Sequence, residues 1–344
     1  MKKFLLILLI SILMIGCEKM LLGPGFENTP ADNFDVLWKT IDEKYGLFPV
    51  CPLNWDSLHT VYQSQINEST SENELWEICC QLLSHLNNGH VELANKSYNK
   101  GYCAETPPYE RSTVSTDLIK SKYLTNSAVT GDGNIIYGQI KNSSLGYICI
   151  HSFFGAANGR DWIKDMDDVI KRLFYCNGII IDVRNNGGGY IRNNLYAASF
   201  FIDEEIIYYY SRQKTGPGHY DFGDLIAKKV TPRDDTLKYL KKNVVLTNRY
   251  SASGAEAFTL ILNNLSYSTQ IGDTTIGALG EVSHVVQLPN GWTLYYPCTL
   301  TTLADGSSPE NIGIIPTILI NNSIEDVKAG RDRVIECAID FLSK

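Results

Sequence analysis

A serine at the start of a predicted helix is the first candidate for chemistry. The apolar run Val244–Leu246 ends in a turn of small residues at 251–254, and an apolar helical pattern follows at once. A strand, a tight turn and a helix in this order expose the Ser253 hydroxyl beside the unpaired N–H groups of the helix, where developing negative charge is stabilised. The alternative is that Ser253 and Glu256 form an ordinary Ser-x-x-Glu capping box.

A glycine-rich loop is the second candidate. The apolar run Gly178–Val183 is typical of a strand covered on both faces, and Gly187, Gly188 and Gly189 follow it closely. Consecutive glycines allow backbone N–H groups to approach a ligand and to donate to the oxyanion of a tetrahedral intermediate. The loop lacks the Gly-Lys-Ser/Thr ending of a phosphate loop and the spacing of a dinucleotide site, so a flexible connection is the alternative.

The elements around these residues indicate two parts. Apolar residues at helical spacing predict a helical N-terminal region over residues 33–93, with helices from about Asn33, from about Trp55 and over 72–86. We expect Gly89 to cap the third helix and residues 91–93 to form a short strand. Residues 94–132 are polar and predict a linker.

Strands and helices alternate over residues 133–344, which predicts an α/β core. The expected strands are 135–137, 145–150, 178–183 and one at Val244, and the expected helices are 160–176, 193–202 and 324–342. Asn290-Gly291 lies between two alternating runs and predicts a hairpin over 283–297.

The N-terminus is typical of a targeting segment. Lys2 and Lys3 precede the apolar run Phe4–Ile15, which is shorter than the ~20 residues of a membrane span. The run ends at Gly16-Cys17, which resembles a bacterial lipobox. We expect a signal peptide over 1–16, an acylated Cys17, a tether over 17–32 and a protein anchored by lipid on the periplasmic or cell-surface side of the membrane. The alternatives are an ordinary secretory signal or an uncleaved anchor.

Composition narrows the class of protein. The formal net charge of −8 and the lack of a basic tract argue against nucleic acid as a partner. The eight cysteines after Cys17 form no C-x-x-C pair or metal-site pattern, so we expect neither a metal nor another cofactor. Cys149 and Cys176 lie in apolar runs, which indicates buried thiols.

The glycine loop and the serine turn together resemble the tail-specific (C-terminal processing) serine peptidase family, which includes the tricorn protease core. The motifs are Asp182-Val183-Arg184-Asn185-Asn186-Gly187-Gly188-Gly189 and Ser251-Ala252-Ser253-Gly254-Ala255-Glu256. Gly272–Gly277, Gly313–Pro316 and Asn88-Gly89-His90 support the resemblance. It implies a crotonase-like core, with a mixed sheet and flanking helices, and Ser253 as the nucleophile.

The chain departs from the family at the general base. Processing peptidases of this family use a lysine about 25 residues after the nucleophile, but here that place reads Gly277-Ala278-Leu279-Gly280, and no Lys or Arg lies between Gly254 and Val327. The tricorn-like branch uses a histidine from the N-terminal part and a glutamate before the final Gly-x-x-Pro segment. These match His90 and Glu310. His284 is the rival base.

The resemblance also implies which groups donate to the oxyanion, and it bears on how a peptide substrate could be recognised. The donors would be the N–H groups of Gly254 and of Gly187 or Gly188, while Asp182 and Arg184 would hold the loop. Family members often carry a peptide-binding PDZ domain, for which residues 94–132 are too few.

We therefore expect a lipid-anchored serine endopeptidase that cleaves peptides or unfolded proteins through an acyl-enzyme. The missing lysine leaves two alternatives, a non-catalytic relative that binds a peptide or apolar ligand in the same cleft and an esterase.

Overall fold

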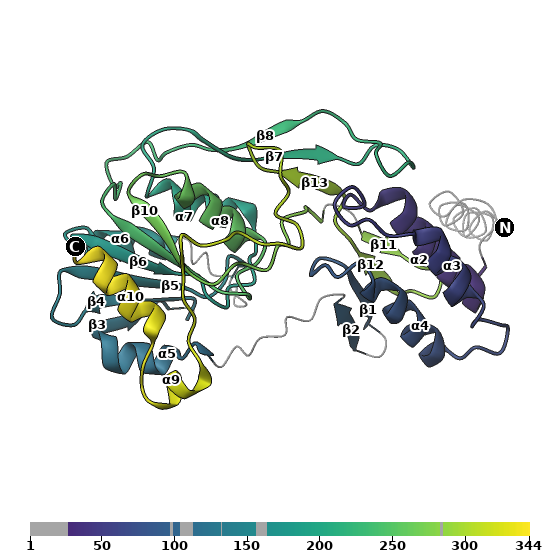
Figure 1. Ribbon diagram of the computed structural model, residues 1–344, viewed down its shortest axis with the longest axis horizontal. Helices are drawn as coiled ribbons and strands as arrows, with labels where there is room; N and C mark the ends of the chain where they lie inside the picture. Colours follow the sequence, from purple (N-terminus) through teal and green to yellow (C-terminus); the bar gives the residue numbers. More distant parts are fainter. Residues whose placement is uncertain (1–26, 97–98, 104–112, 132, 156–163, 283–284) are drawn as a thin grey trace, which may run out of the picture.

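The computed structural model describes residues 27–344 except 97–98, 104–112, 132, 156–163 and 283–284. Two lobes lie side by side, and strands and loops connect them (Figure 1). The larger lobe holds a seven-stranded sheet, and the N-terminal lobe holds a four-stranded sheet covered by helices. The segment predicted to be a signal peptide, Cys17 and the rival base His284 lie outside the described residues. No helix among the described residues is long and apolar enough to cross a membrane.

The large sheet is mixed, with strand order β14-β10-β9-β6-β5-β4-β3. Its strands are β3 (Leu124–Val129), β4 (Ile135–Ile140), β5 (Leu145–Ile150), β6 (Gly178–Asp182), β9 (Asn243–Thr247), β10 (Ser268–Gly272) and β14 (Ile318–Leu319). The strands from β5 to β14 are parallel, whereas β3 and β4 are antiparallel. Every residue of β5, β6 and β9 is buried, as the apolar runs predict.

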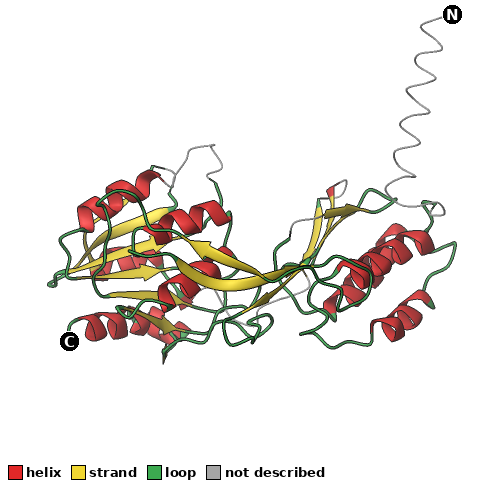
Figure 2. Cartoon of the chain, turned by 90° about the horizontal axis from the view of Figure 1, so that it is seen from above, coloured by secondary structure: helices red, strands yellow, loops and turns green. Residues whose placement is uncertain are grey.

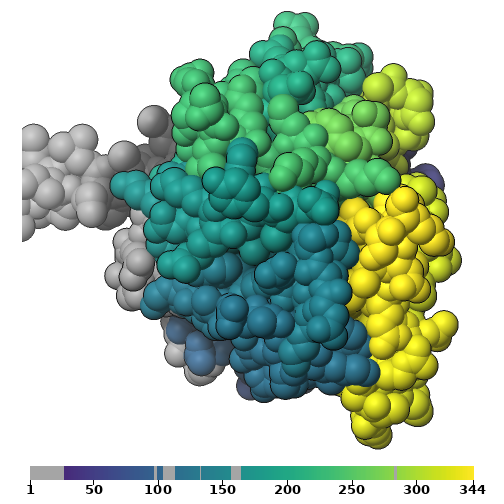
Figure 3. Space-filling view, turned by 90° about the vertical axis from the view of Figure 1, so that its left-hand side faces the viewer, coloured from purple at the N-terminus to yellow at the C-terminus, as the bar shows by residue number. Residues whose placement is uncertain are grey.

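Helices cover both faces of this sheet. One face packs on α6 (Asp165–Leu173), α7 (Ile191–Ser199) and α8 (Gly254–Asn263), and the other packs on α10 (Arg333–Leu342) and the short helices α5 (Thr116–Leu118) and η3 (Ile119–Tyr123). In Figure 3 the yellow C-terminal segment lies beside the blue residues around 113–140. Hydrogen bonds from Asn322 Nδ2 to the Thr113 carbonyl and from the Asp332 N–H to the Tyr123 hydroxyl join these segments. The predicted α/β core with a mixed sheet is confirmed.

The N-terminal lobe packs three helices on its sheet. The helices are α2 (Pro30–Lys44), α3 (Trp55–Gln63) and α4 (Glu72–Ser84), and the strands, in the order β11-β12-β1-β2, are β11 (Val285–Gln287), β12 (Thr293–Tyr295), β1 (Glu92–Asn95) and β2 (Lys100–Cys103). Leu93 pairs with Leu294 in the sheet, and both side chains are buried against the helices. The predicted helices and the hairpin are therefore present, but the hairpin joins the N-terminal lobe rather than the core.

A third sheet connects the lobes. Its order is β13-β7-β8, formed by β7 (Ile206–Gln213), β8 (Ile226–Val230) and β13 (Thr299–Thr302). The long strands extend from the core lobe toward the N-terminal lobe (Figure 2). Tyr208 and Tyr209 at the start of this sheet belong to the core cluster, whereas Cys298, just before β13, belongs to the N-terminal cluster.

Three sequence-based expectations need correction. Gly89 does not cap α4, because the helix ends at Ser84 with His85 as its C-cap. The described part of 94–132 contains the end of β1 as well as β2, α5, η3 and β3; the strand β3 is polar because it lies at the sheet edge, where only Leu124 of its residues is buried. In place of the single helix expected over 324–342 there are two, α9 (Ile324–Lys328) and α10. They are separate because the backbone of Gly330 adopts φ +71° and Asp332 caps the start of α10.

Candidate active site

Ser253 lies in a strained turn at the N-terminus of α8. Its backbone has φ 52° and ψ −113°, a region that non-glycine residues rarely adopt and that costs on the order of 1–3 kcal/mol. Since β6 and β9 are parallel neighbours, the loops that follow them meet at the same edge of the sheet. The Ala252 N–H donates to the Asn186 carbonyl at 3.0 Å, and Ser251 Oγ donates to the Val183 carbonyl at 2.8 Å. The glycine loop and the serine turn are thus adjacent, as the motifs predict.

Gly188 lies directly against Ser253. A Cβ placed on Gly188 would come within 2.7 Å of Ser253 Cβ, of the Gly254 nitrogen and of the Ala252 carbonyl oxygen, and φ of Gly188 is +91°. Both the space and the backbone conformation require glycine here. The close approach explains the glycine at position 188, whereas a Cβ on Gly187 would meet nothing within 4 Å.

The N–H groups of the glycine loop differ in availability. The Gly188 N–H donates to Asn186 Oδ1 at 2.8 Å, so it is already engaged. Within the described residues, the N–H groups of Gly187, Gly189 and Gly254 have no acceptor. A Cβ on Gly254 would lie 3.2 Å from the Gly189 nitrogen, which places Gly189 beside the nucleophile as well.

Glu256 is a buried carboxyl group that ties the nucleophile turn to the segment Thr275–Gly280. One oxygen accepts from the Ser253 N–H at 2.9 Å and from the Ala278 N–H at 2.9 Å. The other accepts from Thr275 Oγ1 at 2.6 Å and from the Gly277 N–H at 2.8 Å. Burial raises the pKa of Glu256, and these four hydrogen bonds oppose the rise. Glu256 therefore does more than complete a capping box.

His90 is held in one tautomer by the segment Thr275–Gly280. Its Nδ1 lies 2.7 Å from the Gly280 carbonyl oxygen, and a carbonyl can only accept a hydrogen bond, so Nδ1 carries the proton. In the neutral ring Nε2 is then left as a proton acceptor. Burial lowers the pKa of His90, although the bond to Gly280 acts in the opposite direction. The imidazole is therefore neutral at pH 7.

Glu310 contacts the surroundings of His90 rather than its ring. Glu310 is 2% exposed, and its Oε1 accepts from the Leu279 N–H at 2.9 Å. Its Oε2 accepts from Asn88 Nδ2 at 3.4 Å, and Asn88 Oδ1 in turn accepts from the His90 N–H at 3.0 Å. Burial, together with the nearby Glu256, raises the pKa of Glu310 to about 8, although the hydrogen bonds to its carboxylate oppose the rise. Glu310 is thus largely protonated at pH 7 and fixes the segments on both sides of the imidazole.

The segment Thr275–Gly280 brings the predicted residues together. It bonds through Glu256 to the Ser253 turn, through Leu279 to Glu310 and through Gly280 to His90. No hydrogen bond joins Ser253 to His90 within the described residues. Ala278 lies in the stretch where the resemblance leads us to expect a lysine; it is 1% exposed, and the stretch contacts Glu256 and His90 through backbone N–H and carbonyl groups.

A buried ion-pair network anchors the glycine loop. Arg184 donates to Asp182 at 2.7 Å and to Asp332 at 3.0 Å, and the Tyr147 hydroxyl donates to Asp182 at 2.7 Å. Burial would lower the pKa of Arg184, but the two carboxylates raise it well above its usual range. The same pairing holds the pKa of Asp332 low despite burial. Asp182 and Arg184 therefore connect the end of β6 to the start of α10.

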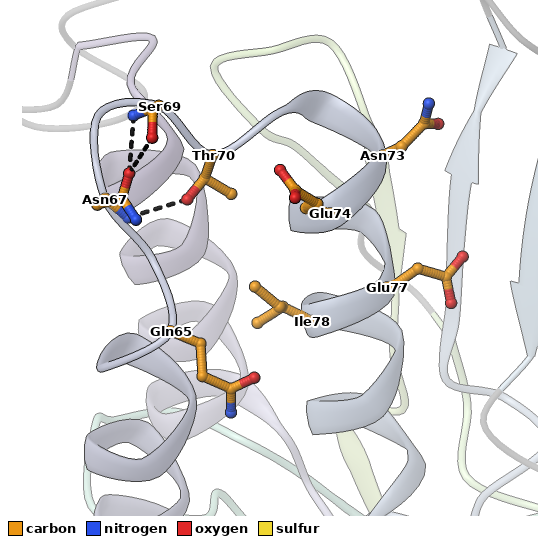
Figure 4. A pocket seen from close by; sticks show the side chains of 8 residues that line it. All are labelled: Gln65, Asn67, Ser69, Thr70, Asn73, Glu74, Glu77 and Ile78. Carbon is orange, nitrogen blue, oxygen red and sulfur yellow. Dashed lines mark hydrogen bonds between the residues drawn. The ribbon is translucent and has the colours of Figure 1, made fainter.

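Other polar features lie apart from this cluster. A pocket of the N-terminal lobe lies between the residues that follow α3, such as Asn67 and Thr70, and the α4 residues Glu74 and Glu77, and none of the predicted site residues lines it (Figure 4). The remaining described histidines contact groups outside the cluster, namely His59 with Asp35, His85 with Tyr62, His151 with Cys149 and His219 with Asp42. Cys149 and Cys176 are buried free thiols, as expected.

The sequence alone did not identify several residues that hold the cluster together. Asn88 and Thr275 each link two of its segments through a side-chain hydrogen bond, and Asn186 Nδ2 fastens the glycine loop to the Ile150 carbonyl at the end of β5. Asn88 lies two residues before His90 and Asn186 lies in the glycine motif, so both had a signal in the motifs themselves. Thr275 lies within the supporting motif Gly272–Gly277, but nothing local predicts its hydrogen bond to Glu256, which lies on another element.

Comparisons with known proteins agree with this geometry. The sequence model of peptidase family S41 matches residues 144–320, and that of the tricorn protease C1 domain matches residues 26–84. The first match covers just over half of the 344 residues. No curated protein matches the chain.

Solved structures share the fold. A candidate peptidase from Parabacteroides merdae ATCC 43184 is 28% identical with a TM-score of 0.80, over 92% of this chain and 97% of that one. Mature CPAF complexed with lactacystin is 13% identical with a TM-score of 0.67, over 91% and 97%. The tricorn protease is 17% identical with a TM-score of 0.57, over 91% of this chain and 36% of that one.

The family match includes both the glycine loop and the serine turn, whose contacts form the cluster around Ser253. The chain therefore belongs to peptidase family S41 and is a serine-type peptidase.

Proposed function

We propose that the protein is an endopeptidase in which Ser253 is the nucleophile, His90 the general base and Glu310 a positioning residue. The observation that carries this proposal is the contact between His90 Nδ1 and the Gly280 carbonyl at 2.7 Å. It leaves Nε2 unprotonated in a neutral ring, which is the state that a base for a serine hydroxyl requires. The expected lysine base is absent, so another base is needed, and His90 supplies it.

The proposed reaction proceeds through an acyl-enzyme. Ser253 Oγ attacks the carbonyl carbon of the scissile peptide bond, and His90 Nε2 takes the hydroxyl proton. The C–N bond then breaks, and the protonated imidazole gives its proton to the leaving amine. Water attacks the ester with His90 again as base, and Ser253 regains its proton when the acid product leaves.

Backbone N–H groups stabilise the oxyanion in this proposal. The Gly254 N–H is one donor, since it stands at the helix N-terminus next to Ser253. Because Gly188 already donates to Asn186, the second donor is Gly187 or Gly189. Donors of this kind contribute about 10²–10³-fold to the rate each.

Reaction with a fluorophosphonate serine probe tests the proposal. We expect labelling of the full chain in detergent, and loss of labelling in Ser253→Ala and His90→Ala. Labelling that survives in His90→Ala but not in His284→Ala would assign the base to His284 instead. Peptide digestion distinguishes a peptidase from an esterase, because only a peptidase releases new peptide termini.

We also propose that the protein is a lipoprotein of the bacterial cell envelope, anchored through Cys17. The support is the charged and apolar start of the chain followed by Gly16-Cys17. Metabolic labelling with an alkyne fatty acid should tag the protein, and Cys17→Ser should abolish the tag. Equal tagging of the Cys17→Ser variant would show that another residue carries the acyl chain.

A further inference from the structure

A pair of exposed aromatic side chains lies just beyond the glycine loop. Phe154 is 56% exposed and Tyr190 is 50% exposed, and their rings meet edge to face with centroids 5.6 Å apart. The neighbouring Phe153 is fully buried in the core, so the chain turns one phenylalanine inward and leaves the next at the surface. We refer to Phe154 and Tyr190 as the aromatic shelf.

The shelf is fixed to the loop that contacts Ser253. The Phe153 N–H donates to the Gly188 carbonyl at 2.7 Å, and the Tyr190 N–H donates to the Phe153 carbonyl at 3.0 Å. A Cβ on Gly189 would come within 2.1 Å of the Phe154 nitrogen. Gly188 touches Ser253 on one side, and its neighbour Gly189 touches Phe154 on the other, so two residues separate the shelf from the nucleophile.

Gly155 and the cationic side chain of Arg192 lie beside the Tyr190 ring of the shelf. A Cβ on Gly155 would lie 3.5 Å from the Tyr190 ring, and the Arg192 guanidinium lies 5.3 Å from the ring centroid. Ile191, the first residue of α7, is 45% exposed and extends the apolar surface. Single exposed apolar residues are common, but adjacent ones beside a reactive group indicate a place where a ligand is bound.

We propose that the aromatic shelf binds a large apolar side chain of the peptide substrate, at a position next to the scissile bond. This inference rests on the proposed function, because it takes Ser253 as the attacking group. The occupant is a substrate side chain because the shelf continues from the loop that would stabilise the oxyanion, so a peptide held there must pass over it. The chain would therefore cleave beside leucine, phenylalanine or similar residues in preference to alanine or acidic residues.

Quenched fluorescent peptides that differ in one flanking residue test the proposal. We expect the wild-type chain to cleave the leucine or phenylalanine peptide roughly tenfold better than the alanine peptide in kcat/KM, the lower end of what an apolar pocket gives per group. Phe154→Ala and Tyr190→Ser should reduce that ratio several-fold, mainly through KM. Tyr190→Phe keeps the ring and should keep the ratio.

The matched control is Tyr175→Ala. Tyr175 is 88% exposed and precedes β6, whereas the glycine loop follows β6. Tyr175 therefore lies at the opposite end of this strand from the loop. Its substitution should leave the ratio unchanged.

Labelling of Ser253 by a small fluorophosphonate separates the two proposals. Normal labelling of Phe154→Ala and Tyr190→Ser with an unchanged preference would overturn the shelf and leave the proposed function standing. If the wild-type chain neither reacts with the probe nor cleaves a peptide, the proposed function fails and the shelf fails with it. If Phe154→Ala does not fold, the comparison of Tyr190→Ser with Tyr190→Phe decides.

Discussion

Replacing Glu310 by glutamine should change how the stability of the protein depends on pH. Burial raises the pKa of Glu310 to about 8 from an ordinary value of 4.5, so the folded state holds this proton more tightly than the unfolded state. The contribution of Glu310 to stability is therefore fully present below about pH 4.5 and is lost as the pH rises through about 8. Glutamine keeps an oxygen that can accept from the Leu279 N–H but does not titrate.

The magnitude follows from linkage. Each pKa unit corresponds to about 1.4 kcal/mol, so between about pH 5 and about pH 8 the group lowers the free energy of unfolding by roughly 3–4 kcal/mol. The difference in unfolding free energy between Glu310→Gln and wild type should shift by this amount in favour of the variant over that range. The depressed pKa of His90 acts with the opposite sign, but it is common to both proteins and cancels in the difference.

Urea unfolding of both proteins at several pH values measures this difference. Parallel pH profiles for the two proteins would refute the reasoning, because they would mean that Glu310 has the same pKa in the folded and unfolded states. Asn88→Asp provides a second check, since a further carboxyl beside Glu310 should steepen the dependence.

Three further predictions concern the groups around the nucleophile. Glu256→Ala leaves four buried donors without their acceptor, at about 1–3 kcal/mol each before water enters, so thermal unfolding should shift down and probe labelling of Ser253 should fall; equal melting temperatures would contradict this. Gly188→Ala should abolish labelling and also lower stability, because its Cβ would meet the Ser253 turn at 2.7 Å and its backbone has φ +91°; labelling at the wild-type rate would show that the loop can move away. The rate of labelling should rise with pH through a pKa below the ordinary 6.5 of histidine, as His90 loses its proton, and a midpoint above 6.5 would exclude His90 as a buried base.

Patterns in the sequence were enough to predict the elements that depend only on neighbouring residues. The buried runs of β5, β6 and β9, the turn at Ser253 and the three N-terminal helices each depend on residues close in the chain, and each is present. What could not be read is where distant segments meet. The sequence of the hairpin β11–β12 does not show that it pairs with β1. The sequence of the Tyr-rich strand β7 does not show that it forms a third sheet with β8 and β13.

The same limit applies to the site. The sequence left open whether Glu310 touches His90, because that depends on the path of residues 275–280, and in the structure Glu310 contacts Leu279 and Asn88 instead. From the sequence, the stretch around Ala278 is notable only because it lacks the expected lysine. In the structure its backbone carbonyl and N–H groups contact His90 and Glu256, and a pattern of side chains cannot predict such backbone contacts.

The hairpin β11–β12 has a consequence for when the protein can become active during synthesis. Its strand β12 pairs with β1 across about two hundred residues of chain, so the sheet beneath α2, α3 and α4 is incomplete until the ribosome has passed Tyr295. His90 immediately precedes β1 and is fastened to Gly280, while Glu310 is made later still. In the proposed mechanism, a nascent chain that already contains Ser253 therefore lacks a positioned base. The order of residues would then delay proteolytic activity until Glu310 has been made.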